Sequence, residues 1–206
     1  MKSIIFNFEI RRKTFHLYGF IVPLFYFFVS KLVMTSLLFL ALIIILPLDM
    51  SRHFNFGVRE LVNKFVGKII RPEEANGSFQ LSGVSYMMAG FFLTALFFSK
   101  GLAITSWLIV IISDCLAALI GIKIGTPLEN GKSLEGSVAF LSSAFFISIL
   151  VYFFVGYNTT FLVIIISSII TTITEFYSKE FSIDDNLSIP VIYCFSTVIF
   201  NFVLGS

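Results

Sequence analysis

The stretch 102–122, LAITSWLIVIISDCLAALIGI, contains a single charged side chain, that of Asp114. About 20 apolar residues in a helix are enough to cross the hydrocarbon core of a bilayer. Six further apolar runs of similar character occur along the chain, at 15–30, 32–48, 81–98, 138–155, 159–176 and 187–204. The sequence therefore predicts an all-α fold, a polytopic membrane bundle of about seven transmembrane helices.

The composition also indicates a membrane protein. Of the 206 residues, 57% are hydrophobic and only 13% are charged, whereas soluble domains contain about 25% charged residues. The net charge of +2 is too small to indicate a nucleic-acid partner. Cys115 and Cys194 lie inside apolar runs, which argues against a disulfide or a zinc site. Nothing indicates a second domain, so we expect residues 1–206 to form one membrane domain.

The distribution of charge predicts the orientation of the chain. With the N-terminus inside, 12 of the 14 Lys and Arg residues lie on the cytoplasmic side, and only Lys31 and Lys100 lie outside. This is the bias that keeps loops in the cytoplasm. All 12 acidic residues lie on the inner side or near the inner ends of spans. Any chemistry is therefore expected at the cytoplasmic face.

One long segment, residues 49–80, joins the second and third apolar runs. Its apolar residues recur at helical spacing, opposite a charged face: Val58, Leu61, Val62, Phe65, Val66, Ile69 and Ile70. This pattern predicts an amphipathic helix in the inner membrane interface, with its basic face toward anionic headgroups. A short helix that only covers the spans is an equal alternative.

Four groups of polar residues gather on the inner side. The first is 9–16, EIRRKTFH, in which Glu9, Lys13 and His16 share one helix face. Together with Arg12, it offers cations for a phosphate and an imidazole at the depth of a lipid headgroup. Taken alone, the residues favour a simpler interpretation, a positively charged anchor for the first span.

The second group surrounds Asp114. A carboxylate within a membrane helix costs about 2.5–3.5 kcal/mol on insertion scales, so it indicates a functional site more than a structural ion pair. Ala117, Gly121 and Gly125 follow at intervals of four residues. Small residues at this spacing allow close approach of another helix, from the same chain or from a second copy. The sequence thus leaves a homo-oligomer open.

The third group is the loop 131–137, GKSLEGS, at the start of the fifth apolar run. Glycine amides, a lysine and a helix N-terminus together favour phosphate binding. The triplet Gly131, Lys132 and Ser133 suggests a Walker A motif, but Thr126 stands where that motif needs glycine and no strand precedes it. The loop therefore indicates a phosphate site without a P-loop NTPase fold.

The fourth group is Asp184, Asp185 and Asn186, which follow Glu175 and Glu180. Carboxylate and amide oxygens are suitable ligands for Mg²⁺. A solvated turn that caps the last helix is the alternative. Together the four groups indicate nucleotide or phosphate chemistry at the inner leaflet, and the residues alone indicate nothing narrower.

Five segments together resemble the dolichol kinase, phytol kinase and yeast-type diacylglycerol kinase family of CTP-dependent lipid kinases: 9–16, 83–86, 113–125, 131–137 and 184–190. Their most specific feature is GKSLEGS placed shortly after Ser-Asp-x-x-Ala-Ala-x-x-Gly. Cys115 departs from the pattern, which has proline there. The resemblance implies CTP as phosphoryl donor, a divalent cation such as Mg²⁺, and an isoprenoid or glyceride alcohol as acceptor. The short chain suggests a bacterial member in the inner (plasma) membrane.

The resemblance also implies roles for individual residues. Asp114 and Asp185 would hold Mg²⁺, with support from Asp184 and Asn186. Lys132 and the amides of Gly131 and Gly136 would bind the CTP phosphates. The remaining residues of the expected site are Ser133, Glu135, Gly121 and Gly125 around the nucleotide, and Arg12, Lys13 and His16 at the transferred group. Arg12 and Lys13 would neutralise developing charge, and His16 would orient or deprotonate the lipid hydroxyl. Glu135 could serve the metal or the ribose.

Two other functions compete with the kinase. A cytidylyltransferase would use the same face to make a CDP-lipid and would release pyrophosphate. A small transporter could use Asp114 as an ion site, although the outer half of the chain offers few polar groups. The sequence does not distinguish phytol, a polyprenol, dolichol or diacylglycerol as the acceptor.

Overall fold

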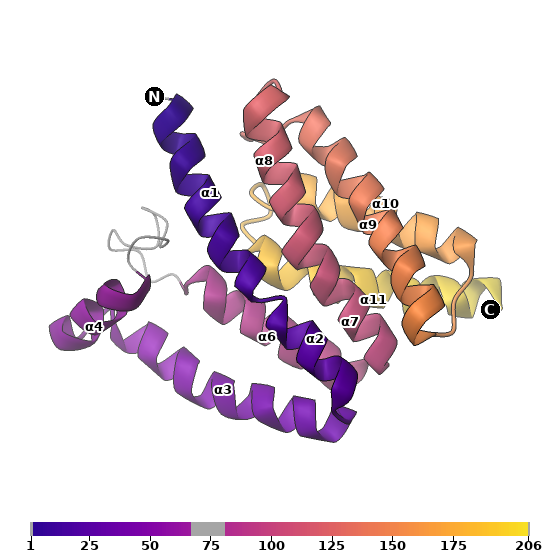
Figure 1. Ribbon diagram of the computed structural model, residues 1–206, viewed down its shortest axis with the longest axis horizontal. Helices are drawn as coiled ribbons and strands as arrows, with labels where there is room; N and C mark the ends of the chain where they lie inside the picture. The colour runs from indigo at the N-terminus through magenta and orange to yellow at the C-terminus, as the bar shows by residue number, and fades with distance from the viewer. Residues whose placement is uncertain (1, 67–80, 206) are drawn as a thin grey trace.

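The computed structural model describes residues 2–66 and 81–205, and within these ranges the chain is helical and contains no strand. The elements, labelled in Figure 1, are α1 (Lys2–Tyr18), α2 (Ile21–Phe28), α3 (Lys31–Ser51), α4 (Phe56–Val66), α6 (Gly83–Phe97), α7 (Lys100–Leu108), the π-helical turn η1 (Ile109–Ser113), α8 (Asp114–Ile124), α9 (Leu134–Val155), α10 (Phe161–Tyr177) and α11 (Asp185–Leu204). The predicted all-α class is confirmed.

Four of these helical segments are long and apolar enough to cross a membrane: Lys31–Ser51, Lys100–Ile124, Leu134–Val155 and Asp185–Leu204. Gly83–Phe97 and Phe161–Tyr177 are apolar but shorter. The predicted span 15–30 is divided between α1 and α2 by a turn at Gly19 and Phe20. Pro23 in the first turn of α2 lacks the N–H that would continue α1, which explains the break. Four candidate spans are therefore identified among the described residues by length and composition, and the predicted number of seven is not confirmed.

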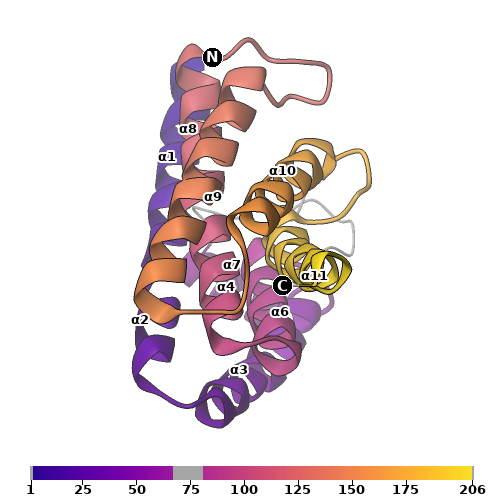
Figure 2. The ribbon, with the colours of Figure 1, turned by 90° about the vertical axis from the view of Figure 1, so that its right-hand side faces the viewer.

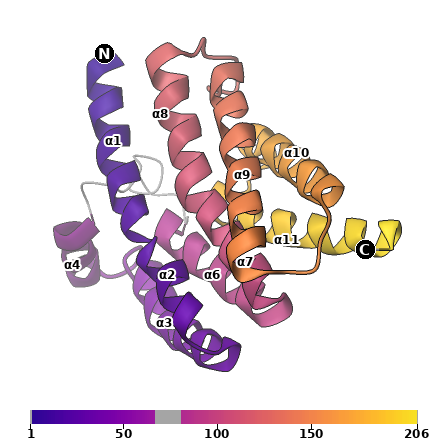
Figure 3. The same ribbon diagram turned by 45° about the vertical axis from the view of Figure 1, so that its right-hand side comes forward.

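The segment α7–η1–α8 forms a continuous helix through the middle of the bundle. α8 lies between α1 and α9, α9 contacts α10, and α10 packs along α11 (Figures 1 and 3). Figure 2 shows α10 and α11 on one side of α9, with α1 and α8 on the other. α6 contacts α3, α7 and α11, so it connects α3 to the central helix and to the C-terminal helix. The central helix is consequently the most buried of the four candidate spans.

The first half of the central helix is held by aromatic stacking. Trp107 stacks on Phe91 with ring centroids 4.6 Å apart and on Tyr26 at 5.1 Å. Its indole Nε1 donates to Thr94 Oγ1 at 2.7 Å, so the polar end of the ring is also satisfied. All four side chains are buried. This cluster fixes α2 and α6 against α7.

The second half of the central helix packs closely on α9 through small residues. A Cβ at Gly136 would lie 2.8 Å from the carbonyl oxygen of Ala117, and one at Gly121 would lie 2.9 Å from Ser133 Oγ. Any larger residue at these positions would push the helices apart. The face formed by Ala117, Gly121 and Gly125 therefore packs within the chain.

The predicted amphipathic helix corresponds to α4 as far as the described residues extend, to Val66. Phe56 and Leu61 are exposed, while Val58 and Val62 are half-buried. The guanidinium of Arg59 donates to the carbonyl oxygens of the two residues 52 and 53 at 3.1 and 3.2 Å, which fixes α4 to the end of α3. The later part of the predicted pattern, including Ile69 and Ile70, lies outside the described residues.

Candidate active site around Asp114

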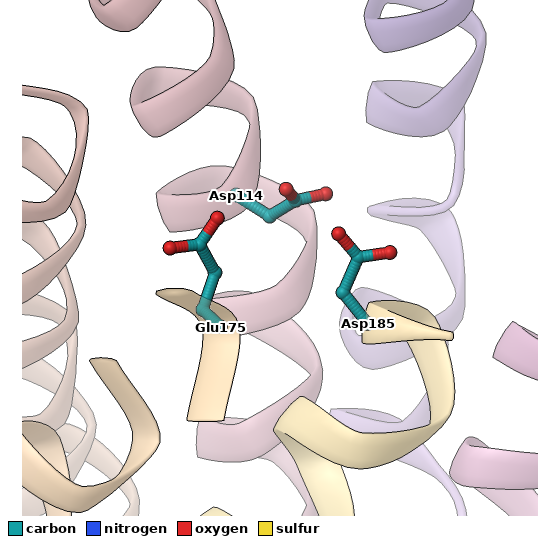
Figure 4. Close-up of side chains that lie close together, drawn as sticks. All are labelled: Asp114, Glu175 and Asp185. Atoms are coloured by element: carbon teal, nitrogen blue, oxygen red, sulfur yellow. The ribbon is translucent and has the colours of Figure 1, made fainter. Parts of the chain in front are cut away.

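Three carboxylates from distant parts of the chain meet beside the centre of the long helix. Asp114 begins α8, Glu175 lies near the end of α10, and Asp185 is the first residue of α11. One carboxylate oxygen of each lies within 4.8 Å of the others, and Figure 4 shows the three side chains gathered between their helices. Asp114 and Glu175 are each only 3% exposed. We call these three residues the acidic triad.

Two lysines complete the cluster. Lys13, from α1, forms an ion pair with Asp114 and is 1% exposed. Lys132, from the loop before α9, pairs with Glu175 and lies 3.5 Å from Asp185. Burying charges is costly unless each is paired, and removal of one partner leaves an uncompensated charge. The five side chains therefore depend on one another, with three negative and two positive charges.

Lys132 is held in its charged form by this environment. Burial lowers its pKa, but the carboxylates of Asp185, Glu175 and Asp114 and the hydrogen bond to Glu175 together raise it by more, so that the pKa of Lys132 lies above the ordinary lysine value. The ammonium therefore persists at neutral pH. Lys132, which the sequence analysis assigned to phosphate binding, is therefore a cation next to the acidic triad.

His16 lies at the π-helical turn that immediately precedes Asp114. Its Nε2–H donates to the carbonyl oxygen of Val110 at 3.0 Å, within η1. This tautomer leaves Nδ1 as the basic nitrogen of the ring. Ser113, the last residue of η1, is fully buried, and its Oγ has no hydrogen-bond partner among the described residues. π-helical turns within α-helices are frequent at functional sites.

The predicted metal-binding group at 184–186 is only partly brought to the triad. Asp185 belongs to it, whereas Asp184 is the N-cap of α11, and its Oδ1 accepts from the Asn186 backbone N–H at 2.9 Å and from Asn186 Nδ2 at 2.7 Å. Asn186 is buried against α6, because a Cβ at Gly83 would lie 3.0 Å from its Nδ2. Asp184 thus takes the capping role that was the alternative interpretation.

The glycine loop contributes Lys132, but its glycines have other roles. The Gly131 N–H donates to the Leu128 carbonyl at 2.8 Å, and the Gly136 N–H donates to Ser133 Oγ at 3.1 Å, where Ser133 caps α9. Both amides that were assigned to the CTP phosphates are therefore engaged within the chain. Gly121 and Gly125 serve the packing of α8 on α9.

Two further charged residues of the predicted site have partners elsewhere. Arg12 pairs with Glu9 one turn earlier on α1, with Nη2 2.9 Å from Oε2. Glu135 accepts from the backbone N–H of Thr126 at 3.2 Å. The Glu135 carboxylate thus connects the start of α9 to the preceding loop.

Glu175 was not among the predicted ligands. It continues a polar line along α10, since Ser167, Thr171 and Glu175 are spaced by four residues and are all buried. This spacing places three polar side chains on one face of an apolar helix. That pattern was the available signal for an inward-facing carboxylate.

Comparison with known proteins gives relatives but no activity. No known family profile and no solved structure matches the chain. The chain is 57% identical over 204 residues to "Uncharacterized protein RP860" of Rickettsia prowazekii (strain Madrid E), an alignment that covers 99% of this chain and 100% of the relative. It is 29% identical over 191 residues to "Uncharacterized protein MJ1137" of Methanocaldococcus jannaschii, with 91% of each chain covered.

Proposed function

We propose that this chain, which belongs to the same family as the Rickettsia prowazekii protein RP860, is a CTP-dependent kinase that phosphorylates the hydroxyl of a long-chain lipid alcohol. The observation that carries the proposal is the buried cluster of the acidic triad with Lys13 and Lys132. Phosphoryl transfer requires carboxylates for a metal ion and cations for the phosphates. The cluster offers both in one place.

The donor set suits a hard divalent cation. The acidic triad supplies oxygen ligands only, which is the preference of Mg²⁺. When bound there, the cation would neutralise the negative charge of the phosphates during transfer. Asp114, Glu175 and Asp185 would hold it, and each comes from a different helix. Asp184 and Asn186 would act indirectly, by fixing the first turn of α11.

The lysines and His16 suit the transfer step. The lipid hydroxyl oxygen attacks the γ-phosphorus, the bond from that phosphorus to the β–γ bridging oxygen breaks, and CDP leaves. His16 Nδ1 accepts the hydroxyl proton, because Nε2 is engaged with Val110. Lys132 and Lys13 neutralise the charge that develops on the phosphate oxygens. Arg12 would add to this positive field from the same helix.

A membrane location would bring the acceptor to the site. Four helices can cross a bilayer by length and composition, and we propose that they place the triad at the cytoplasmic face of a bacterial inner membrane. α4 would lie in the interface, where its exposed Phe56 and Leu61 would contact lipid. A lipid alcohol could then reach His16 by lateral diffusion.

The test is transfer of label in membranes that contain the chain. CTP or ATP labelled at the γ-phosphate is supplied with Mg²⁺ and, separately, with phytol, undecaprenol, dolichol or diacylglycerol. We expect label from CTP in one of these lipids, and none in the Asp114→Asn variant. CTP labelled at the α-phosphate, supplied with the corresponding lipid phosphates, is the control, because its label enters a lipid only if the chain joins CMP to a lipid phosphate and releases pyrophosphate. Absence of transfer from a folded protein would contradict the kinase and direct attention to ion flux.

A further inference from the structure

We infer that the acidic triad takes its divalent cation only together with a polyphosphate, and that Lys132 exchanges carboxylate partners for phosphate partners when the complex binds. The inference rests on the proposed metal site and adds to it the form in which the metal arrives. It follows from where the two ammonium groups lie, from the charge of the cluster and from the position of Lys132 in the fold.

The ammonium of Lys132 occupies carboxylate oxygens that a metal ion would use. It contacts Glu175 and lies 3.5 Å from Asp185 Oδ2, so it bridges two members of the acidic triad. The third member, Asp114, is paired with Lys13. Each carboxylate of the triad therefore already has a cation. A bare divalent ion would have to displace at least one ammonium group.

The charge of the cluster explains why a polyphosphate is needed. Three carboxylates and two ammonium groups leave one net negative charge. A divalent ion added to this set would be repelled by both lysines at short range and in a poorly hydrated place. A displaced ammonium would also remain buried without an anion, which is costly. Phosphate oxygens that arrive with the metal give the displaced ammonium new partners.

Lys132 is better placed to exchange than Lys13. Lys13 is 1% exposed and lies within helix α1, so its ammonium can hardly leave Asp114. Lys132 lies in the non-helical loop between α8 and α9, and its side chain is 17% exposed. A rotation of its flexible stem would move the ammonium from the triad to a phosphate beside it.

The first experiment measures binding of Mn²⁺ alone, from the spectrum of free Mn²⁺ in electron paramagnetic resonance, with the full chain in nanodiscs. The Lys132→Met variant is expected to bind Mn²⁺ at least about tenfold more tightly than the unmodified chain, because the competing cation is gone. Lys179→Met is the matched control. Lys179 is exposed and lies near the same loop, with its Nζ 3.1 Å from the position of a Cβ at Gly131. The Mn²⁺ affinity of the Lys179→Met variant should equal that of the unmodified chain.

The second experiment measures retention of α-labelled CTP in equilibrium dialysis. The unmodified chain should retain CTP when Mn²⁺ is present and release it when Mn²⁺ is removed. Lys132→Met should bind Mn²⁺ and yet lose most of the retained CTP. Lys179→Met should behave as the unmodified chain. These opposite effects on metal and nucleotide distinguish an exchanging lysine from one that only stabilises the fold.

A variant that leaves Glu175 and Asp185 without Lys132 could fail to fold, so the comparison is repeated with charge balance preserved. Lys132→Met combined with Glu175→Gln removes one charge of each sign. It should bind Mn²⁺ more tightly than Glu175→Gln alone. Equal Mn²⁺ affinities with and without Lys132, in both backgrounds, would overturn the inference. So would an absence of Mn²⁺ binding in every variant.

The outcome can be separated from that of the proposed function. Both experiments measure binding and use no lipid acceptor. Tighter Mn²⁺ binding and lost CTP in Lys132→Met, together with no label transfer to any lipid, would support the exchange and contradict the kinase. Label transfer with unchanged Mn²⁺ affinity in Lys132→Met would support the kinase and contradict the exchange.

Discussion

The two halves of the helix Lys100–Ile124 satisfy their polar groups in different ways. In α7, the hydroxyls of Thr105 and Ser106 donate to carbonyl oxygens of the preceding turn, at 2.8 and 2.9 Å, and Trp107 donates to Thr94. All these groups are neutral. Most partners lie within one turn, and the contacts of Trp107 with α2 and α6 are aromatic stacking.

In α8, the first residue is a charged group whose partner lies 101 positions away. Asp114 pairs with Lys13 from α1, and the triad adds Glu175 and Asp185 from the C-terminal part of the chain. A π-helical turn separates the two halves. One helix therefore carries a neutral core, where a substitution should cost stability, and a charged centre, where a substitution should cost chemistry.

Asp114→Asn should have the largest effect. The amide keeps the shape of the side chain but removes a proposed metal ligand, so we expect the rate of phosphoryl transfer to fall by at least about a hundredfold. It also leaves Lys13 buried and unpaired, which should lower the free energy of unfolding by about 3–5 kcal/mol. Label transfer and thermal unfolding in detergent measure the two effects.

A second substitution separates chemistry from stability at this centre. Asp114→Asn combined with Lys13→Met removes both charges of the pair and should recover much of the lost stability. It should not recover transfer. Recovery of transfer would show that Asp114 acts only as a structural partner of Lys13.

Trp107→Ala should show the opposite pattern in the neutral half. Removal of the indole leaves a cavity between Phe91 and Tyr26, and we expect a loss of about 3–5 kcal/mol in the free energy of unfolding. Protein that remains folded at low temperature should keep most of its transfer rate. A transfer rate as low as that of Asp114→Asn in folded protein would mean that the two halves are not functionally distinct.

Gly136→Ala tests the packing that supports the charged half. The added methyl group would lie 2.8 Å from the Ala117 carbonyl, a backbone atom that cannot move aside alone. We expect a loss of about 1–3 kcal/mol, as for other overpacked sites. Ser137→Ala, at the next position, is the control and should be nearly neutral. Equal unfolding temperatures for the two variants would contradict the close approach of α8 and α9.

Asp184→Ala should have the smallest effect. Loss of an N-cap costs about 1 kcal/mol, and transfer should stay within a few-fold of the unmodified rate because Asp184 caps α11 and lies outside the acidic triad. The measurement is transfer at saturating Mg²⁺ together with thermal unfolding. A loss as large as that expected for Asp114→Asn would place Asp184 among the metal ligands after all.

Much of the fold could be predicted from periodicity and length, because apolar runs of bilayer length have few alternatives to a helix. The break of the first run at Gly19 was missed, since glycine and the nearby Pro23 are both tolerated inside apolar runs. The predicted number of spans is not confirmed for a related reason: an apolar run shows that a segment is buried or lipid-facing, but its composition does not set where the helix ends.

The site was predicted unevenly. Asp114, Lys13 and Lys132 were identified because charge in or beside an apolar run is conspicuous. Glu175 was not included in the predicted site because it lies at the end of its run, where a carboxylate is ordinary. Asp184 and Asp185 are adjacent and chemically identical. The sequence therefore does not indicate which of them caps α11 and which joins the acidic triad. Such details depend on the packing of helices that are distant in the sequence.

The most direct test of the central claim compares Glu175→Gln with Glu180→Gln. The two substitutions are chemically identical and five positions apart, but Glu175 belongs to the acidic triad, whereas Glu180 is exposed beyond the end of α10. With γ-labelled CTP, Mg²⁺ and the accepted lipid alcohol, Glu175→Gln should lose transfer by at least about a hundredfold, and Glu180→Gln should keep it. Equal transfer by the two variants would contradict a metal-dependent kinase built on this triad.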